Sequence, residues 1–131
     1  MDADTQRLTE LVRAACQGMG PFRPFALYDP QLDRVIVQTR DCSICEVRVN
    51  DVLTMYEANH PVEGKDKYCG FEIACMRYFQ RQYGLQGSVL ISELLDCALF
   101  GRPESLNWLQ IARGLAAELS ERTVELTRTA E

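Results

Sequence analysis

The sequence predicts an α+β fold in which a small antiparallel β-sheet is packed by helices. Short runs rich in β-branched side chains cluster between residues 25 and 49, and turn residues separate them. Segments with apolar residues three and four positions apart, the spacing of an amphipathic helix, lie before and after this region. Because the strand-like runs are grouped, the pattern favours an antiparallel sheet over a parallel βαβ arrangement. We expect about three strands and about five helices in two layers.

The first predicted helix covers residues 5–18. Its apolar residues fall on one stripe, Asp4 is placed to cap its first turn, and two glycines and a proline follow it. Three strands come next and form an antiparallel meander over residues 25–49. The predicted strands are residues 25–28, 34–40 and 44–49, connected by turns at residues 29–33 and 41–43.

Three more helices are predicted before residue 101. Asn50 can cap a short helix that ends at Asn59-His60-Pro61, and a polar loop continues to residue 68. Residues 69–83 have the clearest helical pattern in the chain, with Gly84 at the position of a left-handed C-cap. Residues 89–100 form the next helix, because their apolar residues share one face and a glycine follows them.

Residues 103–128 are predicted to form one long C-terminal helix. It begins at Pro103, a residue suited to the first turn, and its second half carries little apolar surface. Its heptad-spaced residues are Leu109, Ala112, Ala116, Leu119, Thr123 and Leu126. Helices with such a seam pair with one another, and twofold dimers are the commonest assemblies. We therefore expect a homodimer through this helix, within a single globular domain spanning residues 1–131.

Composition and charge narrow the class of protein. The chain has 131 residues, 47% of them hydrophobic and 25% charged, which is typical of one self-sufficient globular domain. A net charge of −5 argues against a nucleic-acid-binding protein, because such proteins usually carry a basic surface. The sequence has no apolar run long enough to span a membrane, and its acidic start does not resemble a signal peptide. We expect a cytosolic protein without a membrane partner.

The six cysteines are the unusual feature of the composition. In reducing cytosol, cysteines are expected to be thiols or metal ligands and not structural disulfides. Cys16, Cys75 and Cys97 lie on or beside apolar helical stripes, which predicts that they are core residues. The other three cysteines, Cys42, Cys45 and Cys69, have no such explanation and are the candidates for chemistry.

A zinc site is one interpretation of these residues. Cys42 and Cys45 form a C-x-x-C motif, and two thiolates at this spacing can bind one metal ion without straining the backbone. Cys69 and His60, the only histidine, could complete a Cys₃His site with the spacing C-x₂-C-x₁₄-H-x₈-C. The second half of this pattern lacks the paired spacing of common zinc motifs. Cys45 also fits an ordinary small core residue in a hairpin.

Thiol chemistry without a metal is the other interpretation. Cys69 stands at the head of the predicted 69–83 helix, near Lys65 and Lys67, where the helix dipole and nearby cations would favour a thiolate. A thioredoxin-type mechanism at the C-x-x-C motif is disfavoured, because a strand and not a helix is predicted to follow it. The sequence also lacks the short motifs of nucleotide-binding proteins, zinc proteases and serine hydrolases.

The leading functional hypothesis is a small cytosolic regulatory or accessory protein that acts through protein contacts and is not an enzyme. Two alternatives stay open. One is a structural zinc module, and the other is a thiol-based redox sensor or enzyme centred on Cys69 or on the C-x-x-C motif.

Overall fold

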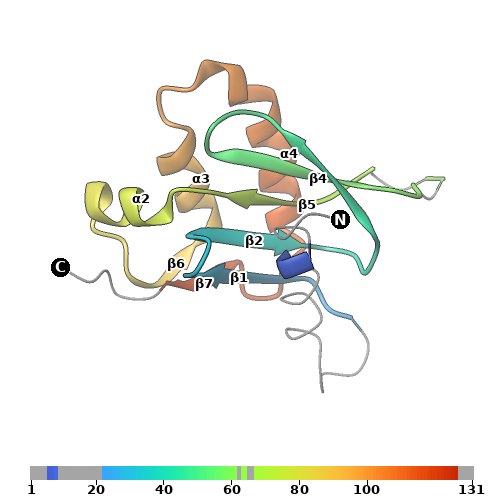
Figure 1. Cartoon of the computed structure of the whole chain (residues 1–131), viewed down its shortest axis with the longest axis horizontal. Coiled ribbons are helices and arrows are strands. Elements are labelled where there is room, and N and C mark those ends of the chain that lie inside the picture. Colours follow the sequence, from blue (N-terminus) through green and yellow to red (C-terminus); the bar gives the residue numbers. More distant parts are fainter. Residues whose placement is uncertain (1–5, 9–21, 62, 65–66, 127–131) are drawn as a thin grey trace.

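The computed structural model describes residues 6–8, 22–61, 63–64 and 67–126, and it confirms the predicted α+β class (Figure 1). Its main feature is a five-stranded antiparallel sheet with the strand order β1-β2-β5-β4-β3. The strands are β1 (Phe25–Asp29), β2 (Arg34–Gln38), β3 (Ile44–Arg48), β4 (Leu53–Ala58) and β5 (Tyr68–Ile73). Most of the helix predicted over residues 5–18 lies outside the described residues. The part that is described, residues 6–8, is helical.

The meander predicted over residues 25–49 contains the right strands in the wrong arrangement. β1 pairs with β2 as expected, but β2 then pairs with β5, and β3 pairs with β4. Residues 41–43 are therefore not a hairpin turn, because they carry the chain from β2 to the far edge of the sheet. The order depends on pairing with β4 and β5, which lie later in the chain, so local patterns do not encode it.

The segment after Asn50 is a strand and not the short helix that the sequence predicts. The Asn50 Oδ1 atom accepts hydrogen bonds from the backbone N–H groups of Val52 and Leu53, at 3.0 and 2.8 Å. These bonds close a tight turn that leads directly into β4. A side chain of this kind can cap a helix or close a turn, and here it closes a turn.

The helix predicted over residues 69–83 is correct only in its second half. Its first half is β5, in which Phe71 and Ile73 are buried on one face of the sheet. Helix α2 (Met76–Tyr83) begins after Cys75. The φ of Cys75 is 61°, in the left-handed region, so the chain changes direction between β5 and α2. Side chains at positions 71 and 75 fit a helical stripe by spacing alone, so the helical pattern extended too far into the strand.

Helix α3 (Ile91–Leu99) is close to its predicted limits. The predicted apolar stripe of this helix is buried as a whole, and its members are Ile91, Leu94, Leu95, Ala98 and Leu99. Gly84 also occupies its predicted place, as the left-handed C-cap of α2 with a φ of 66°. The apolar stripe of α3 and the C-cap of α2 were therefore predicted correctly.

The long helix predicted over residues 103–128 is wrong. A short 3₁₀ helix, η1 (Pro103–Ser105), leads into α4 (Leu106–Ala116), and the chain then forms strand β7 (Thr123–Leu126). β7 pairs with β6 (Gly87–Leu90) in a two-stranded sheet and lies beside β1 (Figure 1).

The burial pattern of β7 explains this correction. Val124 and Leu126 are buried and Glu125 is exposed, which is the alternation of a strand with one face covered. The continuous heptad seam from Leu109 to Leu126 is therefore absent. Dimerisation itself stays a prediction, without the helix that suggested it.

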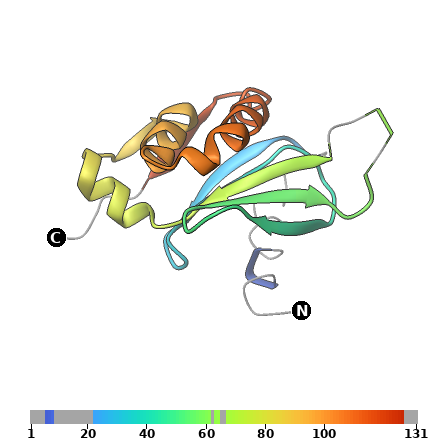
Figure 2. The same ribbon diagram turned by 90° about the horizontal axis from the view of Figure 1, so that it is seen from above.

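The two faces of the five-stranded sheet are covered by different parts of the chain (Figure 2). Helices α3 and α4 lie over one face, α2 lies at the end of the sheet beside α3, and residues 6–8 lie on the opposite face. All three helices contribute side chains to the main core. The sheet residues of the main core include Val35, Val37, Leu53, Met55, Phe71 and Ile73. In the described part of the chain, none of the helices has both the length and the apolar character needed to cross a bilayer.

Candidate functional site

Two cysteines that are distant in sequence meet on the sheet face opposite the helices. Cys42 lies in the connection after β2, Cys69 is the second residue of β5, and their sulfur atoms are 3.4 Å apart. The connection is held against β5 because the backbone N–H and the hydroxyl of Thr39 donate to the Cys69 carbonyl, at 2.8 and 3.1 Å. These hydrogen bonds fix the chain three residues before Cys42 against Cys69 itself.

A β-bulge turns Cys69 toward this face. The register between β4 and β5 shifts, so that Tyr56 is opposite Gly70 while Glu57 is opposite Tyr68, and Cys69 is the extra residue. Tyr68 then packs against Trp108 under the helices, with ring centroids 5.4 Å apart. Cys69 packs on the opposite side, in a second buried cluster whose other members are Leu8, Ile36, Tyr56 and Ala58.

The environments of the two thiols differ. Cys69 is fully buried, and its thiol donates to the Tyr56 carbonyl at a distance of 3.6 Å. Burial raises the pKa of the Cys69 thiol to about 12, and the neighbouring Cys42 contributes to this rise. Cys42 is partly exposed. The expected position of Cys69 at a helix N-terminus is wrong, because Cys69 lies inside strand β5 and is buried.

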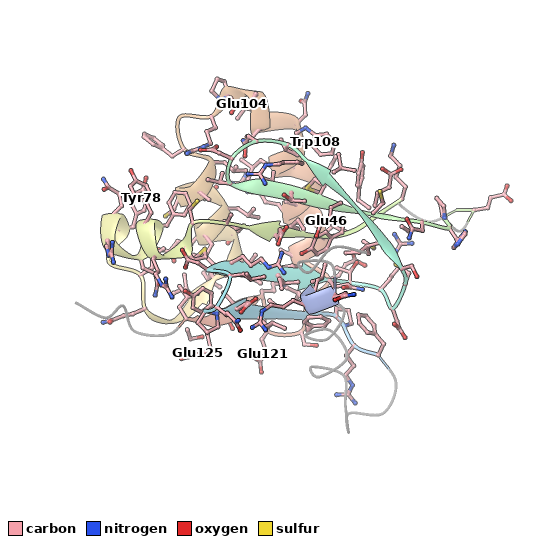
Figure 3. All side chains as sticks on the ribbon, in the orientation of Figure 1. Glu46, Tyr78, Glu104, Trp108, Glu121 and Glu125 are labelled. Carbon is pink, nitrogen blue, oxygen red and sulfur yellow. The ribbon has the colours of Figure 1, made fainter. Side chains whose placement is uncertain are left out.

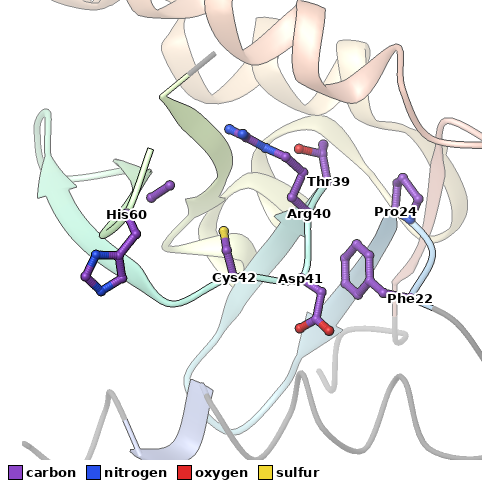
Figure 4. Close-up of a pocket in the computed structure, with 8 residues that line it drawn as sticks. Phe22, Pro24, Thr39, Arg40, Asp41, Cys42 and His60 are labelled. Carbon is purple, nitrogen blue, oxygen red and sulfur yellow. The ribbon is translucent and has the colours of Figure 1, made fainter. Parts of the chain in front are cut away.

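Cys42 opens onto a pocket of about 380 Å³ (Figure 4). This volume is within the range of small-molecule sites. The pocket is lined by Phe22, Pro24, Thr39, Arg40, Asp41, Cys42, Ala58 and His60. Small reagents that enter it meet Cys42 first, since Cys69 lies behind it in the buried cluster.

The structure brings together some of the four predicted zinc ligands. Cys42 contacts Cys69, and His60 lines the same pocket as Cys42. Cys45 is exposed on β3, and strand alternation places it on the opposite face from Ile44. Ile44 and Cys42 both pack against the buried cluster that contains Cys69. Among the residues that the structure describes, no group of three or more possible metal ligands is present. Zinc binding stays a prediction.

The three cysteines assigned to the core have different outcomes. Cys75 is exposed, because its left-handed backbone conformation lies between β5 and α2 and not within a helix. Cys97 is partly buried and packs against the main core, as predicted. Cys16 lies outside the described residues.

A buried charge cluster shares the sheet face with the thiol pair. Arg34 donates from Nη1 to the Glu72 carboxylate at 2.6 Å, and both side chains are about nine-tenths buried. Burial raises the pKa of Glu72, and the charge of Arg34 opposes that rise. Glu72 is buried because it lies in β5 between Phe71 and Ile73, with its side chain on the sheet face away from the helices.

Comparison of the chain with protein-family models, with curated proteins and with solved structures gives no match. A function for the protein therefore has to be inferred from the chemistry of its own residues.

Proposed function

We propose that this chain is a small cytosolic regulatory protein whose protein contacts are controlled by a reversible disulfide between Cys42 and Cys69. The sulfur–sulfur distance of 3.4 Å is the observation that carries this proposal. A disulfide bond is about 2.05 Å long, so the sulfur atoms need to approach by little more than an ångström. Neither residue is an enzyme's catalytic group in this proposal, because the thiols themselves are the switch.

The oxidant that we propose is a hydroperoxide. The Cys42 thiolate attacks one peroxide oxygen, the O–O bond breaks, and Cys42 becomes a sulfenic acid while the leaving oxygen takes a proton. The sulfur of Cys69 then attacks the sulfur of Cys42, the S–O bond breaks, and water leaves with the Cys69 proton. With hydrogen peroxide, two thiols lose two electrons and two protons in total, and two water molecules form.

The positions of the two thiols support this division of roles. Cys42 lines the open pocket, so a peroxide reaches it directly. Cys69 is buried and protonated, which protects it from the oxidant until Cys42 has reacted. In a reducing cytosol the resting state is the dithiol, so the disulfide acts as a signal and not as a permanent link.

Exposed apolar side chains on the helical layer support a role in protein contacts. Phe100, Leu106 and Tyr78 are 77, 61 and 59% exposed. Tyr78 lies on α2 (Figure 3), Phe100 directly follows α3, and Leu106 is the first residue of α4. Exposed apolar side chains that form one contiguous patch often mark an interaction site. We propose this layer as the surface through which the protein meets its partner, and the contact of Tyr68, the neighbour of Cys69 in β5, with Trp108 of α4 as its connection to the thiol pair.

A redox titration tests the proposed switch. The protein is equilibrated in glutathione buffers of graded potential, and free thiols are counted at each cysteine by maleimide labelling and peptide mass spectrometry. We expect Cys42 and Cys69 to lose their labels together, in one two-electron transition that dithiothreitol reverses. Cys45 is expected to stay labelled throughout.

Two variants are the controls for this titration. Cys45→Ser is the matched control, because it removes the other half of the C-x-x-C motif and is expected to leave the transition unchanged. Cys69→Ser is expected to replace it with a glutathione adduct on Cys42. If Cys42 and Cys69 titrate independently, or if Cys45→Ser abolishes the transition, the proposal is wrong.

A further inference from the structure

Two arginines approach one buried carboxylate on the sheet face that residues 6–8 cover. Asp29, at the end of β1, is fully buried. Arg7 holds it with two hydrogen bonds, from Nε to Oδ2 at 3.2 Å and from Nη2 to Oδ1 at 3.0 Å. The Nε atom of Arg34 is also near, at 3.9 Å from Oδ2, which is too far for a hydrogen bond.

Arg34 has an edge without hydrogen-bond acceptors in the described part of the chain, and the Nε atom of this edge lies beside the Asp29 carboxylate. Its Nη1 atom donates to Glu72, but its Nε and Nη2 atoms are buried and have no hydrogen-bond acceptor among the described residues. The Nε–Nη2 edge of a guanidinium group matches the two oxygens of a carboxylate. Donors that are buried without an acceptor cost free energy, so this edge favours any movement that supplies one.

We propose that Arg7 and Arg34 exchange Asp29, and that this exchange makes residues 6–8 a releasable cover of the sheet face. In the closed state, which the structure shows, Asp29 is paired with Arg7. In the open state Arg7 leaves, and Asp29 moves by about an ångström to pair with the free edge of Arg34. The buried carboxylate therefore keeps a partner in both states, which lowers the cost of opening.

The cover hides the second buried cluster. Leu8 is 2% exposed and packs against Ile36, Tyr56 and Cys69, so release of residues 6–8 uncovers an apolar part of the sheet and the buried thiol. Arg7 lies at the edge of the covered area, with 30% of its side chain exposed, so water can reach the ion pair and compete for it. This inference goes beyond the proposed redox switch and does not depend on disulfide formation.

The alkylation rate of Cys69 measures how often the cover opens. The experiment uses the full chain carrying Cys42→Ser, so that no Cys42–Cys69 disulfide can form, and follows Cys69 by peptide mass spectrometry with iodoacetamide. We expect Arg7→Gln to increase the Cys69 rate about tenfold, because it removes the closed-state partner of Asp29. Arg23→Gln is the matched control, since Arg23 is an exposed arginine outside this ion pair, and it is expected to leave the rate unchanged.

Removing Arg34 tests the exchange itself. Asp29 keeps the hydrogen bond from the Gln31 N–H, at 3.0 Å, in every state. In the double variant Arg34→Gln/Glu72→Gln it has no second arginine to pair with, so we expect Cys69 alkylation to become several times slower. Adding Arg7→Gln to this double variant is then expected to lower the urea midpoint far more than it does in the parent. Arg34→Lys is the second variant if the double variant does not fold, because it keeps the charge beside Glu72 without the planar edge, and it too is expected to slow alkylation.

Two results would overturn the exchange. One is a Cys69 alkylation rate that Arg7→Gln leaves unchanged. The other is a change in Cys69 alkylation rate and urea midpoint on Arg7→Gln that is the same whether position 34 holds Arg, Gln or Lys. Since Cys42 is absent from all these proteins, failure here leaves the redox proposal standing, and failure of the redox titration leaves the exchange standing.

Discussion

Replacing Gly70 with alanine is expected to destabilise the protein by about 3 kcal/mol, near the upper end of the effects of overpacking. A Cβ atom at this position would lie 2.2 Å from the carbonyl oxygen of Val37 and 3.0 Å from the ring of Tyr56. The Val37 oxygen belongs to the backbone of β2, the neighbouring strand, so it cannot move aside without breaking the β2–β5 pairing. Urea denaturation measures the loss.

Gly114→Ala is the matched control for this substitution. Gly114 lies on the exposed side of α4, and a Cβ atom there would meet nothing within 4 Å. Alanine is favoured over glycine inside a helix by roughly 0.5–1 kcal/mol, so this variant is expected to be more stable than the parent. If Gly70→Ala is as stable as Gly114→Ala, the bulge that turns Cys69 away from the helices is misplaced.

The second large effect is expected when Arg34 is replaced with methionine. This change leaves the Glu72 carboxylate buried without its charged partner, and breaking such a pair costs about 3–5 kcal/mol. The double variant Arg34→Met/Glu72→Met removes both charges and is expected to recover most of the lost stability. Urea denaturation of the two variants beside the parent measures the difference.

The loss caused by Arg34→Met is expected to depend on pH. Burial raises the pKa of Glu72 and Arg34 opposes this rise, so removal of Arg34 moves the pKa further above the unfolded value of about 4.3. A carboxyl group with a raised folded pKa lowers stability as the pH rises above its unfolded pKa. The penalty should therefore be smaller at pH 4 than at pH 7. An equal penalty at both values would show that Glu72 is not the stranded charge.

Local patterns predicted the parts of the fold that local interactions determine. The stripe of α3 and the glycine after α2 were predicted correctly, because helix packing and capping involve neighbouring residues. Strand β5 was predicted as helix, because its place in the centre of the sheet depends on β2 and β4. Strand β7 was predicted as helix because Thr123 and Leu126 fit a heptad pattern. The same segment also has the alternating burial of a strand, with Val124 and Leu126 buried and Glu125 exposed.

The sequence identified the two cysteines of the candidate site but not their contact with each other. Cys42 and Cys69 were both chosen, but sequence spacing joined Cys42 to Cys45, which is three residues away and turned to the other face. The contact between Cys42 and Cys69 spans 27 residues and depends on the bulge in β5. One available signal was the alternation of β3, which already separates Cys45 from Ile44. The Arg34–Glu72 ion pair was missed because Glu72 lies in β5, which was predicted as helix.

Direct mapping of the oxidised bond tests the central claim. The reduced protein is treated with one equivalent of hydrogen peroxide, digested without reduction and analysed by tandem mass spectrometry. A cross-linked pair of peptides that contains Cys42 and Cys69 is the expected main product. A Cys42–Cys45 disulfide, or a Cys42 sulfinic acid beside an unmodified Cys69, would contradict the proposed switch.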